Sequence, residues 1–274
     1  MRYEHIVRGI FKSRPNRFIA HVEVNGKQVV CHVKNTGRCR ELLIPGVPVF
    51  LEFHPEAGKM GRKTEYDLIG VMKGDILVNM DSQAPNKVAW EWMQGMAQME
   101  NGQKRREYLP GLQPDRHAES DRSGEMLFRE PGNDPILWLP RNIRREVTHG
   151  DSRFDLAFTL ENRTEASLKR PAFMEVKGVT LEQNGQALFP DAPTERGVKH
   201  LKGLAKACQE GYEAYVLFVI QMKGVSSFRP NDATHPAFGG ALREAAAAGV
   251  HVLAYDCAAT ADSLTIDTPV TVTL

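Results

Sequence analysis

The amino-terminal part of the chain alternates apolar and polar residues over short runs, which is the period of half-buried strands. Two pairs of runs flank turn sequences, Asn25-Gly26 and Lys73-Gly74-Asp75, a pattern typical of tight hairpins. This density of short strands predicts a small OB-like β-barrel over residues 1–81. The expected strands cover 18–24, 29–33, 47–53, 66–72 and 76–80.

Between these strands, residues 34–43 form a polar stretch that contains Gly37. We expect a turn that runs into a short helical segment. Its backbone amides could hold an anion, helped by Arg38 and Arg40. A simple connecting loop with a capping Asn or Thr is the alternative interpretation.

After residue 81 helical periodicity alternates with apolar strand-like runs. The order is helix, three strands, helix, strand, helix and strand, which predicts an α/β domain with a mixed sheet over 82–274. Residues 98–134 are rich in charge, Gly and Pro, and we expect a mobile insertion there. The expected helices cover 86–97, 194–210 and 237–248, and the expected strands cover 144–148, 153–160, 172–181, 215–221 and 250–255.

Charge is unevenly distributed, although the chain has a net charge of only +1. Residues 1–63 hold 12 Lys and Arg against 5 Asp and Glu, so the remainder is net acidic. The barrel is therefore the expected polyanion-facing surface, and an ordinary solvated face is the alternative. The candidate nucleic-acid contacts on it are Arg8, Lys12, Arg14, Arg17, Arg38 and Arg40.

Hydrophobic residues make up 42% of the chain, but no apolar run approaches the length of a membrane span and no apolar segment follows the start. We expect a cytoplasmic protein without a membrane partner. The 4 cysteines show no C-x-x-C spacing, so we expect reduced and mostly buried thiols. Metal binding by Cys31 and Cys39 is the less favoured alternative.

The candidate chemistry lies on two neighbouring strands. Glu175 and Lys177 share one face of the run 172–179, and Asp155 lies on the less apolar side of the run 152–158. If the strands pair, two carboxylates and an ammonium converge, which suits Mg²⁺ or Mn²⁺ and a phosphate. The Val176 carbonyl would add a metal ligand. A half-exposed strand with a charged outer face is the alternative.

An Asp on the second strand and Glu-x-Lys on the third resemble the core of the PD-(D/E)xK nuclease superfamily, with Phe154 in place of the usual proline. Over nearly its whole length the chain also resembles the sugar fermentation stimulation protein A family. The matching stretches are Asn35–Leu43, Val78–Asn79, Arg153–Asp155, Met174–Thr180, Phe189–Ala192 and Thr194–Leu201.

This resemblance implies an OB-like amino-terminal domain, a restriction-endonuclease-like αβββαβ domain and nucleic-acid binding. It implies that Asp155 and Glu175 bind metal and that Lys177 is catalytic. Residues at the start of the helix that faces the cleft in such folds would hold phosphate, unless they are only a capped, solvated helix end. They are Glu195, Arg196, Lys199 and His200. Glu91 is our guess for a further carboxylate from the first helix.

Three functions fit these features. The first is a Mg²⁺- or Mn²⁺-dependent nuclease that acts on DNA, with RNA as a second possibility. The second is a non-catalytic DNA-binding regulator, which the family name links to sugar-utilisation genes; no helix-turn-helix signature to read bases is visible in the sequence. The third is a barrel that binds a sugar or nucleotide. Oligomeric state, strandedness and sequence preference stay open.

Overall fold

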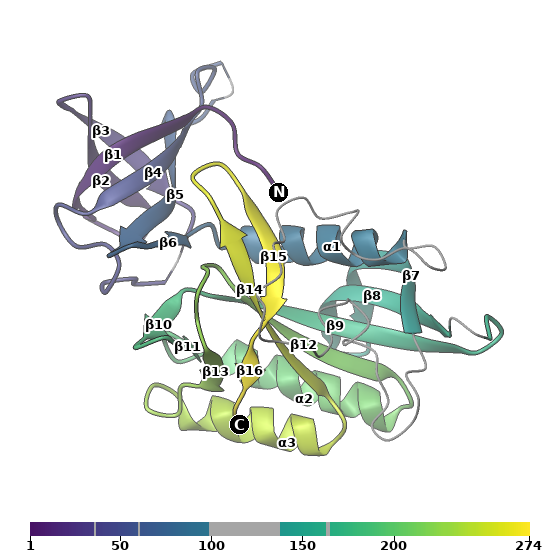
Figure 1. The fold of residues 1–274 in the computed structure, drawn as a ribbon. Helices are drawn as coiled ribbons and strands as arrows, with labels where there is room; N and C mark the ends of the chain where they lie inside the picture. Colours follow the sequence, from purple (N-terminus) through teal and green to yellow (C-terminus); the bar gives the residue numbers. More distant parts are fainter. Residues whose placement is uncertain (36, 60, 99–137, 163–164) are drawn as a thin grey trace, which may run out of the picture.

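We describe a computed structural model of the chain, and the described residues are 1–35, 37–59, 61–98, 138–162 and 165–274. A barrel and a larger sheet-and-helix unit lie against each other, and the polypeptide passes from one to the other at residues 80–83 (Figure 1). The carboxy-terminal hairpin also contacts the start of the chain, since the Met1 ammonium donates to Leu264 O at 2.8 Å.

The amino-terminal unit is a closed barrel, which confirms the predicted OB-like fold. The strand order is β3-β2-β1-β4-β5-β6, and an additional β3–β5 pairing closes the barrel. Asn25 and Gly26 both adopt positive φ (50° and 75°), as the hairpin sequence predicts. The strands are β1 (Ile6–Ser13), β2 (Ile19–Val24), β3 (Lys27–Val33), β4 (Pro48–Phe53), β5 (Tyr66–Lys73) and β6 (Ile76–Asn79).

The short helical segment expected within 34–43 is wrong, because the described residues between β3 and β4 form turns and no helix. Arg14 explains the difference. Its guanidinium bonds the carbonyls of Asn35, Gly37 and Arg38, which are acceptors that a helix would need for its own backbone. Pro45 also follows closely, and a proline disfavours helical geometry in the residue before it.

The second unit is a mixed six-stranded sheet with helices on both faces (Figure 1). The mixed sheet agrees with the prediction, whereas its edge strand β15 was not predicted. Its strand order is β15-β14-β12-β9-β8-β7, with β12 parallel to both β9 and β14. The principal elements are α1 (Ala84–Ala97), β7 (Trp138–His149), β8 (Ser152–Asn162), β9 (Lys169–Val179), α2 (Glu195–Gln209), β12 (Glu213–Ile220), α3 (Pro236–Ala247), β14 (His251–Ala259) and β15 (Leu264–Pro269).

A second, four-stranded sheet was not predicted. Its order is β10-β11-β13-β16, and two of its three pairings are parallel contacts between segments remote in sequence. Its strands have only two to four residues, too short for an alternation pattern to be recognised. They are β10 (Leu181–Gln183), β11 (Gln186–Phe189), β13 (Ser227–Pro230) and β16 (Thr271–Val272).

The helices divide the core of the larger unit. Trp92 and Met93 of α1 pack on one face of the sheet, so the Trp and Met stripe is core. Leu204 of α2 and Phe238 of α3 pack on the other face, in a cluster that continues into the barrel interior. The two units are thus joined by a shared apolar core as well as by the chain.

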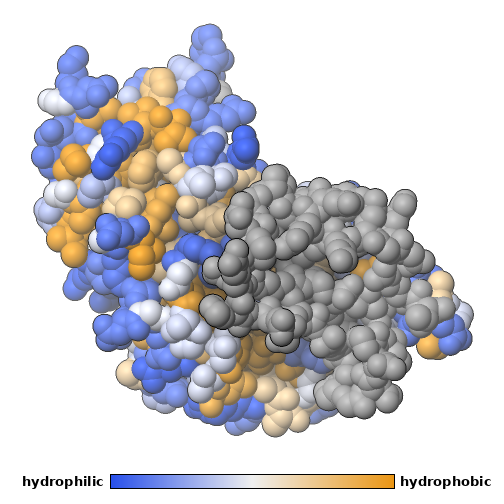
Figure 2. Space-filling view, in the orientation of Figure 1, coloured by the Kyte–Doolittle hydropathy of each residue, from blue (hydrophilic) through white to orange (hydrophobic). Residues whose placement is uncertain are grey.

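Three further expectations concern the insertion, membrane spans and the cysteines. Apart from Gln98, the insertion expected over 98–134 lies outside the described residues. Within the described ranges no helix has the length and apolar character needed to cross a membrane. Figure 2 shows hydrophilic and hydrophobic residues interspersed over one face of the barrel. Burial raises the pKa of the Cys31 and Cys39 thiols to about 12, so the thiolate form that binds metals is disfavoured.

Candidate active site and basic groove

Strands β8 and β9 bring the two predicted carboxylates to one place. They pair antiparallel with Leu156 opposite Met174, so the next residues, Asp155 and Glu175, follow at the end of the ladder. Asp155 Oδ2 accepts from the Val176 backbone N–H at 2.8 Å. This short tie fixes the carboxylate against the backbone of the neighbouring strand.

The first helix contributes an amide to this site and not the guessed carboxylate. Asn86, in the first turn of α1, donates its Nδ2 to Asp155 Oδ1 at 2.8 Å. Glu91 lies instead with its Oε2 2.7 Å from the Met1 ammonium. Sequence analysis missed Asn86, and the available signal was a polar residue at the start of a helix that packs on the strands with the acids.

Glu175 is the most deeply buried of the predicted catalytic residues, with 2% of its surface exposed. Its Oε1 accepts from Lys177 Nζ at 2.6 Å and is also in contact with His200 Nδ1. Its Oε2 is buried and has no hydrogen-bond partner among the described residues. Because burying a polar atom without a hydrogen-bond partner is costly, this geometry does not fit a strand with a merely solvated charged face.

The two carboxylates have opposite pKa shifts. Burial and the negative charge of Glu175 raise the pKa of Asp155, although the Val176 and Asn86 hydrogen bonds and Lys177 oppose this. Burial also acts to raise the pKa of Glu175, but the His200 hydrogen bond and the Lys177 ammonium outweigh it and leave the pKa lowered. The effects of burial and of Glu175 on Asp155 are therefore only partly offset by its hydrogen bonds and by Lys177.

Helix α2 places its first two turns beside these strands. Thr194 caps the helix, since its Oγ1 accepts from the Gly197 N–H at 3.0 Å. One turn later His200 Nδ1 lies 3.3 Å from Lys177 Nζ, and Arg196 Nε donates to His200 Nε2 at 3.2 Å. His200 thus contacts Glu175 and Arg196 contacts His200, while Lys199 is exposed on the same helix.

The donor set fits a divalent cation. The partnerless Oε2 of Glu175 and the repelled carboxylate of Asp155 are oxygen ligands, which hard cations prefer, and a cation between them would relieve both problems. Val176 gives its N–H to Asp155, and its carbonyl as a metal ligand stays a prediction. Lys177 is 14% exposed in its side chain, so its amine lies near solvent at the mouth of the site.

Most of the basic residues predicted on the barrel gather around one groove of about 530 Å³. Arg8, exposed on β1, is not among its lining residues. Within the groove Lys12 Nζ pairs with Glu23 at 2.8 Å. The lining residues are Phe11, Lys12, Ser13, Arg14, Asn16, Arg17, Arg38, Arg40, Leu43 and Pro45.

Arg14 differs from the other basic residues of this groove. Its NH1 donates to the carbonyls of Gly37 and Arg38 at 2.9 and 2.7 Å, and its NH2 donates to those of Arg17 and Asn35 at 2.7 Å each. Four of its donors are thereby committed to backbone. Its position is that of a support for the loop that carries Arg38, so a direct phosphate contact by Arg14 stays an untested prediction.

A second cavity, of about 310 Å³, lies at the junction of the two units. On the barrel side it is lined by Asn35, Gly37 and Ser82, and on the sheet side it includes Gly178 and Thr194. Gly37 directly precedes Arg38 of the groove, and Gly178 directly follows Lys177. The cavity therefore borders the loop that carries Arg38 and the strand that carries the catalytic candidates.

Comparison with known proteins supports the same two-part organisation. Residues 13–80 match the family model described as the SfsA N-terminal OB domain, and residues 132–263 match that of the sugar fermentation stimulation protein RE domain. Among curated proteins, the chain is 51% identical to the sugar fermentation stimulation protein homolog of Desulfitobacterium hafniense (strain Y51), over 100% of this chain and 99% of that protein. The corresponding homolog of Ruminiclostridium cellulolyticum is 44% identical, over 94% and 92%.

Among solved structures, the fold is similar to that of Pyrococcus furiosus SfsA in complex with Ca²⁺, with a TM-score of 0.71. The alignment covers 100% of this chain and 98% of that chain at 24% identity. At this identity the similarity shows the fold alone, whereas the more similar curated relatives show the family. Because two family models match in order and full-length relatives share about half of its residues, the chain belongs to the sugar fermentation stimulation protein family.

Proposed function

We propose that the chain is a divalent-metal-dependent phosphodiesterase that acts on nucleic acid, with DNA as the proposed substrate. The observation that carries the proposal is the buried, partnerless Oε2 of Glu175 beside the repelled carboxylate of Asp155. A protein that only binds a polyanion gains nothing from two carboxylates that repel phosphate. With a cation held between them, the same pair attracts it.

In this proposal Asp155 and Glu175 hold Mg²⁺ or Mn²⁺, and the Val176 carbonyl completes the protein ligands. When bound, such an ion would polarise a phosphodiester oxygen and lower the pKa of a water. Asn86 and the Val176 N–H keep Asp155 oriented. Lys177, held by Glu175 and His200, supplies positive charge where negative charge develops on the phosphate.

The remaining cations would hold the strand. Arg196 and Lys199 lie at the start of α2, where backbone N–H groups favour a phosphate. Lys12, Arg17 and the loop residues Arg38 and Arg40 line the groove on the barrel. In this proposal a strand bound along the barrel crosses the junction, where the second cavity lies, to reach the carboxylates.

The test is incubation of the purified full chain with labelled single-stranded DNA, duplex DNA and RNA, each with Mg²⁺, Mn²⁺ or chelator. We expect cleavage that requires metal and is lost in Asp155→Asn and Lys177→Ala. Glu161→Gln is the matched control, because Glu161 is a carboxylate of the same strand β8 that pairs with Lys169 away from the site. It should retain full activity.

Binding without cleavage under any metal would refute the nuclease and favour the non-catalytic regulator. In that case the carboxylates would be a structural ion site. Absence of binding to all three substrates at low salt would refute both proposals, since a backbone-binding groove must bind more tightly as salt falls.

A further inference from the structure

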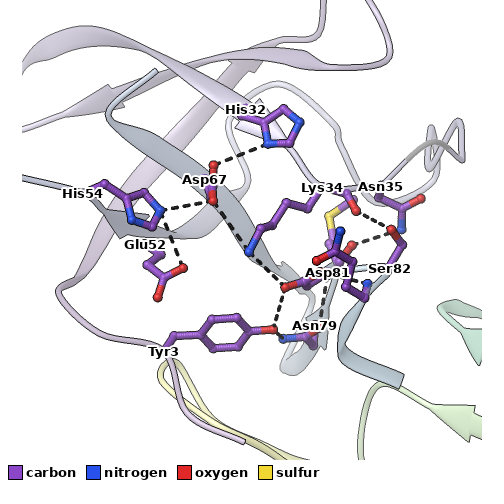
Figure 3. Close-up of polar contacts among 12 residues, drawn as sticks. Tyr3, His32, Lys34, Asn35, Glu52, His54, Asp67, Asn79, Asp81 and Ser82 are labelled. Atoms are coloured by element: carbon purple, nitrogen blue, oxygen red, sulfur yellow. Dashed lines mark hydrogen bonds and ion pairs between the residues drawn. The ribbon is translucent and has the colours of Figure 1, made fainter. Parts of the chain in front are cut away.

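A separate cluster of metal-ligating side chains lies on the barrel, on the wall formed by β3, β4 and β5. Glu52 of β4 and Asp67 of β5 are register partners across an antiparallel ladder. His54 directly follows β4, and Figure 3 shows its ring turned toward both carboxylates. We call Glu52, His54 and Asp67 the barrel cluster. None of these three residues belongs to the proposed nucleic-acid contacts or to the carboxylate pair on β8 and β9.

The ligand atoms of the barrel cluster have metal-site spacing. His54 Nε2 lies 3.1 Å from Asp67 Oδ2 and 3.6 Å from Glu52 Oε2, and one atom from each of the three residues lies within 4.8 Å of the others. In a tetrahedral site with bonds of about 2.0–2.1 Å, ligand atoms are about 3.3 Å apart. The observed distances lie on either side of that value.

Asp67 is held as a metal-binding carboxylate usually is. Its side chain is only 1% exposed, and its Oδ1 accepts from Arg62 NH2 at 2.5 Å and lies 3.4 Å from His32 Nδ1. His32 is the register partner of Asp67 on the other side, in β3. Arg62 and His32 thus hold Oδ1, while Oδ2 faces His54. In metal sites, groups that do not touch the ion commonly orient the ligands in this way.

Accessibility and charge also fit. The side chains of Glu52 and His54 are 15% and 23% exposed, so a cation can enter from solvent and keep a water ligand. Arg62 offsets the charge of Asp67 through Oδ1, and the second carboxylate, that of Glu52, adds the negative charge that attracts a dication to the side of the cluster facing His54. Lys34 Nζ also lies 3.6 Å from Asp67 Oδ2, and its other partner is Asp81 Oδ2 at 3.3 Å, so it can pair with Asp81 when a cation binds at Asp67 (Figure 3).

We propose that Glu52, His54 and Asp67 form a second metal site, which binds a transition-metal dication of the zinc class. The imidazole nitrogen selects the ion, because nitrogen ligands favour zinc over magnesium and calcium. The ion would join the end of β4 to β5 and so stabilise the barrel. This inference does not depend on the proposed nuclease activity.

The experiment measures zinc retained after dialysis by the full chain carrying Asp155→Asn and Glu175→Gln, which removes the other candidate metal ligands. We expect about one zinc ion per chain and a thermal midpoint that rises with Zn²⁺ but not with Mg²⁺. Adding His54→Gln or Glu52→Gln should abolish both effects. Circular dichroism of each variant without metal shows that it is folded.

His21→Gln is the matched control, since His21 is a barrel histidine on β2 whose ring contacts Ser13 outside the cluster. It should retain the zinc. Replacing Zn²⁺ by Co²⁺ adds a spectroscopic readout, because visible absorption bands report the ligand geometry directly. Failure to retain zinc, or equal retention after His54→Gln, would overturn the proposal whatever the result of the cleavage assay.

Discussion

Replacing Arg14 by Ala tests whether this residue supports the loop of the basic groove. Two of its four hydrogen bonds to backbone, those to Gly37 O and Asn35 O, are partly buried, and the other two are exposed. A hydrogen bond from a charged donor contributes about 1.5–3 kcal/mol, and exposed ones contribute less. Counting only the partly buried pair at the lower value, we expect the free energy of unfolding to fall by about 3 kcal/mol.

The assay is urea unfolding of the full chain, with Lys12→Ala as the matched control. Lys12 lines the same groove, but its pair with Glu23 is exposed at both ends, and such pairs contribute about 0.2–1 kcal/mol. The unfolding midpoint should fall for Arg14→Ala and hardly change for Lys12→Ala, with the slope unchanged in both.

Arg14→Lys separates a supporting role from a phosphate contact. A lysine keeps the charge but lacks the planar guanidinium that reaches four carbonyls. The Arg14→Lys variant should therefore be destabilised nearly as much as Arg14→Ala. A midpoint shift for Arg14→Ala no larger than that of Lys12→Ala would refute the reasoning. So would Arg14→Lys with wild-type stability.

Three further predictions follow from buried groups. Because the pKa of Asp155 is raised in the folded state, the free energy of unfolding falls as pH rises from the ordinary carboxyl pKa through the raised one. With chelator present, Asp155→Asn should therefore be more stable than wild type at neutral pH. Its thermal midpoint should also depend less on pH. Gln221 donates to Asn79 O and Asp81 O, so Gln221→Met should cost about 1–3 kcal/mol in urea unfolding, and unchanged stability would contradict this account of the unit junction. Phe218 is fully buried against α3, and Phe218→Ala should cost about 3–5 kcal/mol by the same measurement.

The sequence by itself determined the elements whose signal is local. Alternation with period two and the Asn25-Gly26 turn predict the barrel hairpin, because both depend on residues only a few positions apart. The same holds for α2, where Thr194 caps the helix and Gly211 follows its end. Asp155, Glu175 and Lys177 were found as candidates from strand periodicity and family resemblance.

Only the tertiary structure decided which partners these residues meet. Asn86 reaches Asp155 across 69 positions of sequence, and Gln221 reaches Asn79 across 142, so no local pattern could have paired them. The roles of Arg14 and of the barrel cluster likewise depend on contacts between separate segments, with the loop after β3 for Arg14 and across the β4–β5 ladder for the cluster. Strand periodicity depends on neighbouring residues, so the sequence alone predicts it. Burial and side-chain pairing arise only when segments distant in sequence pack together, so only the tertiary structure decides them.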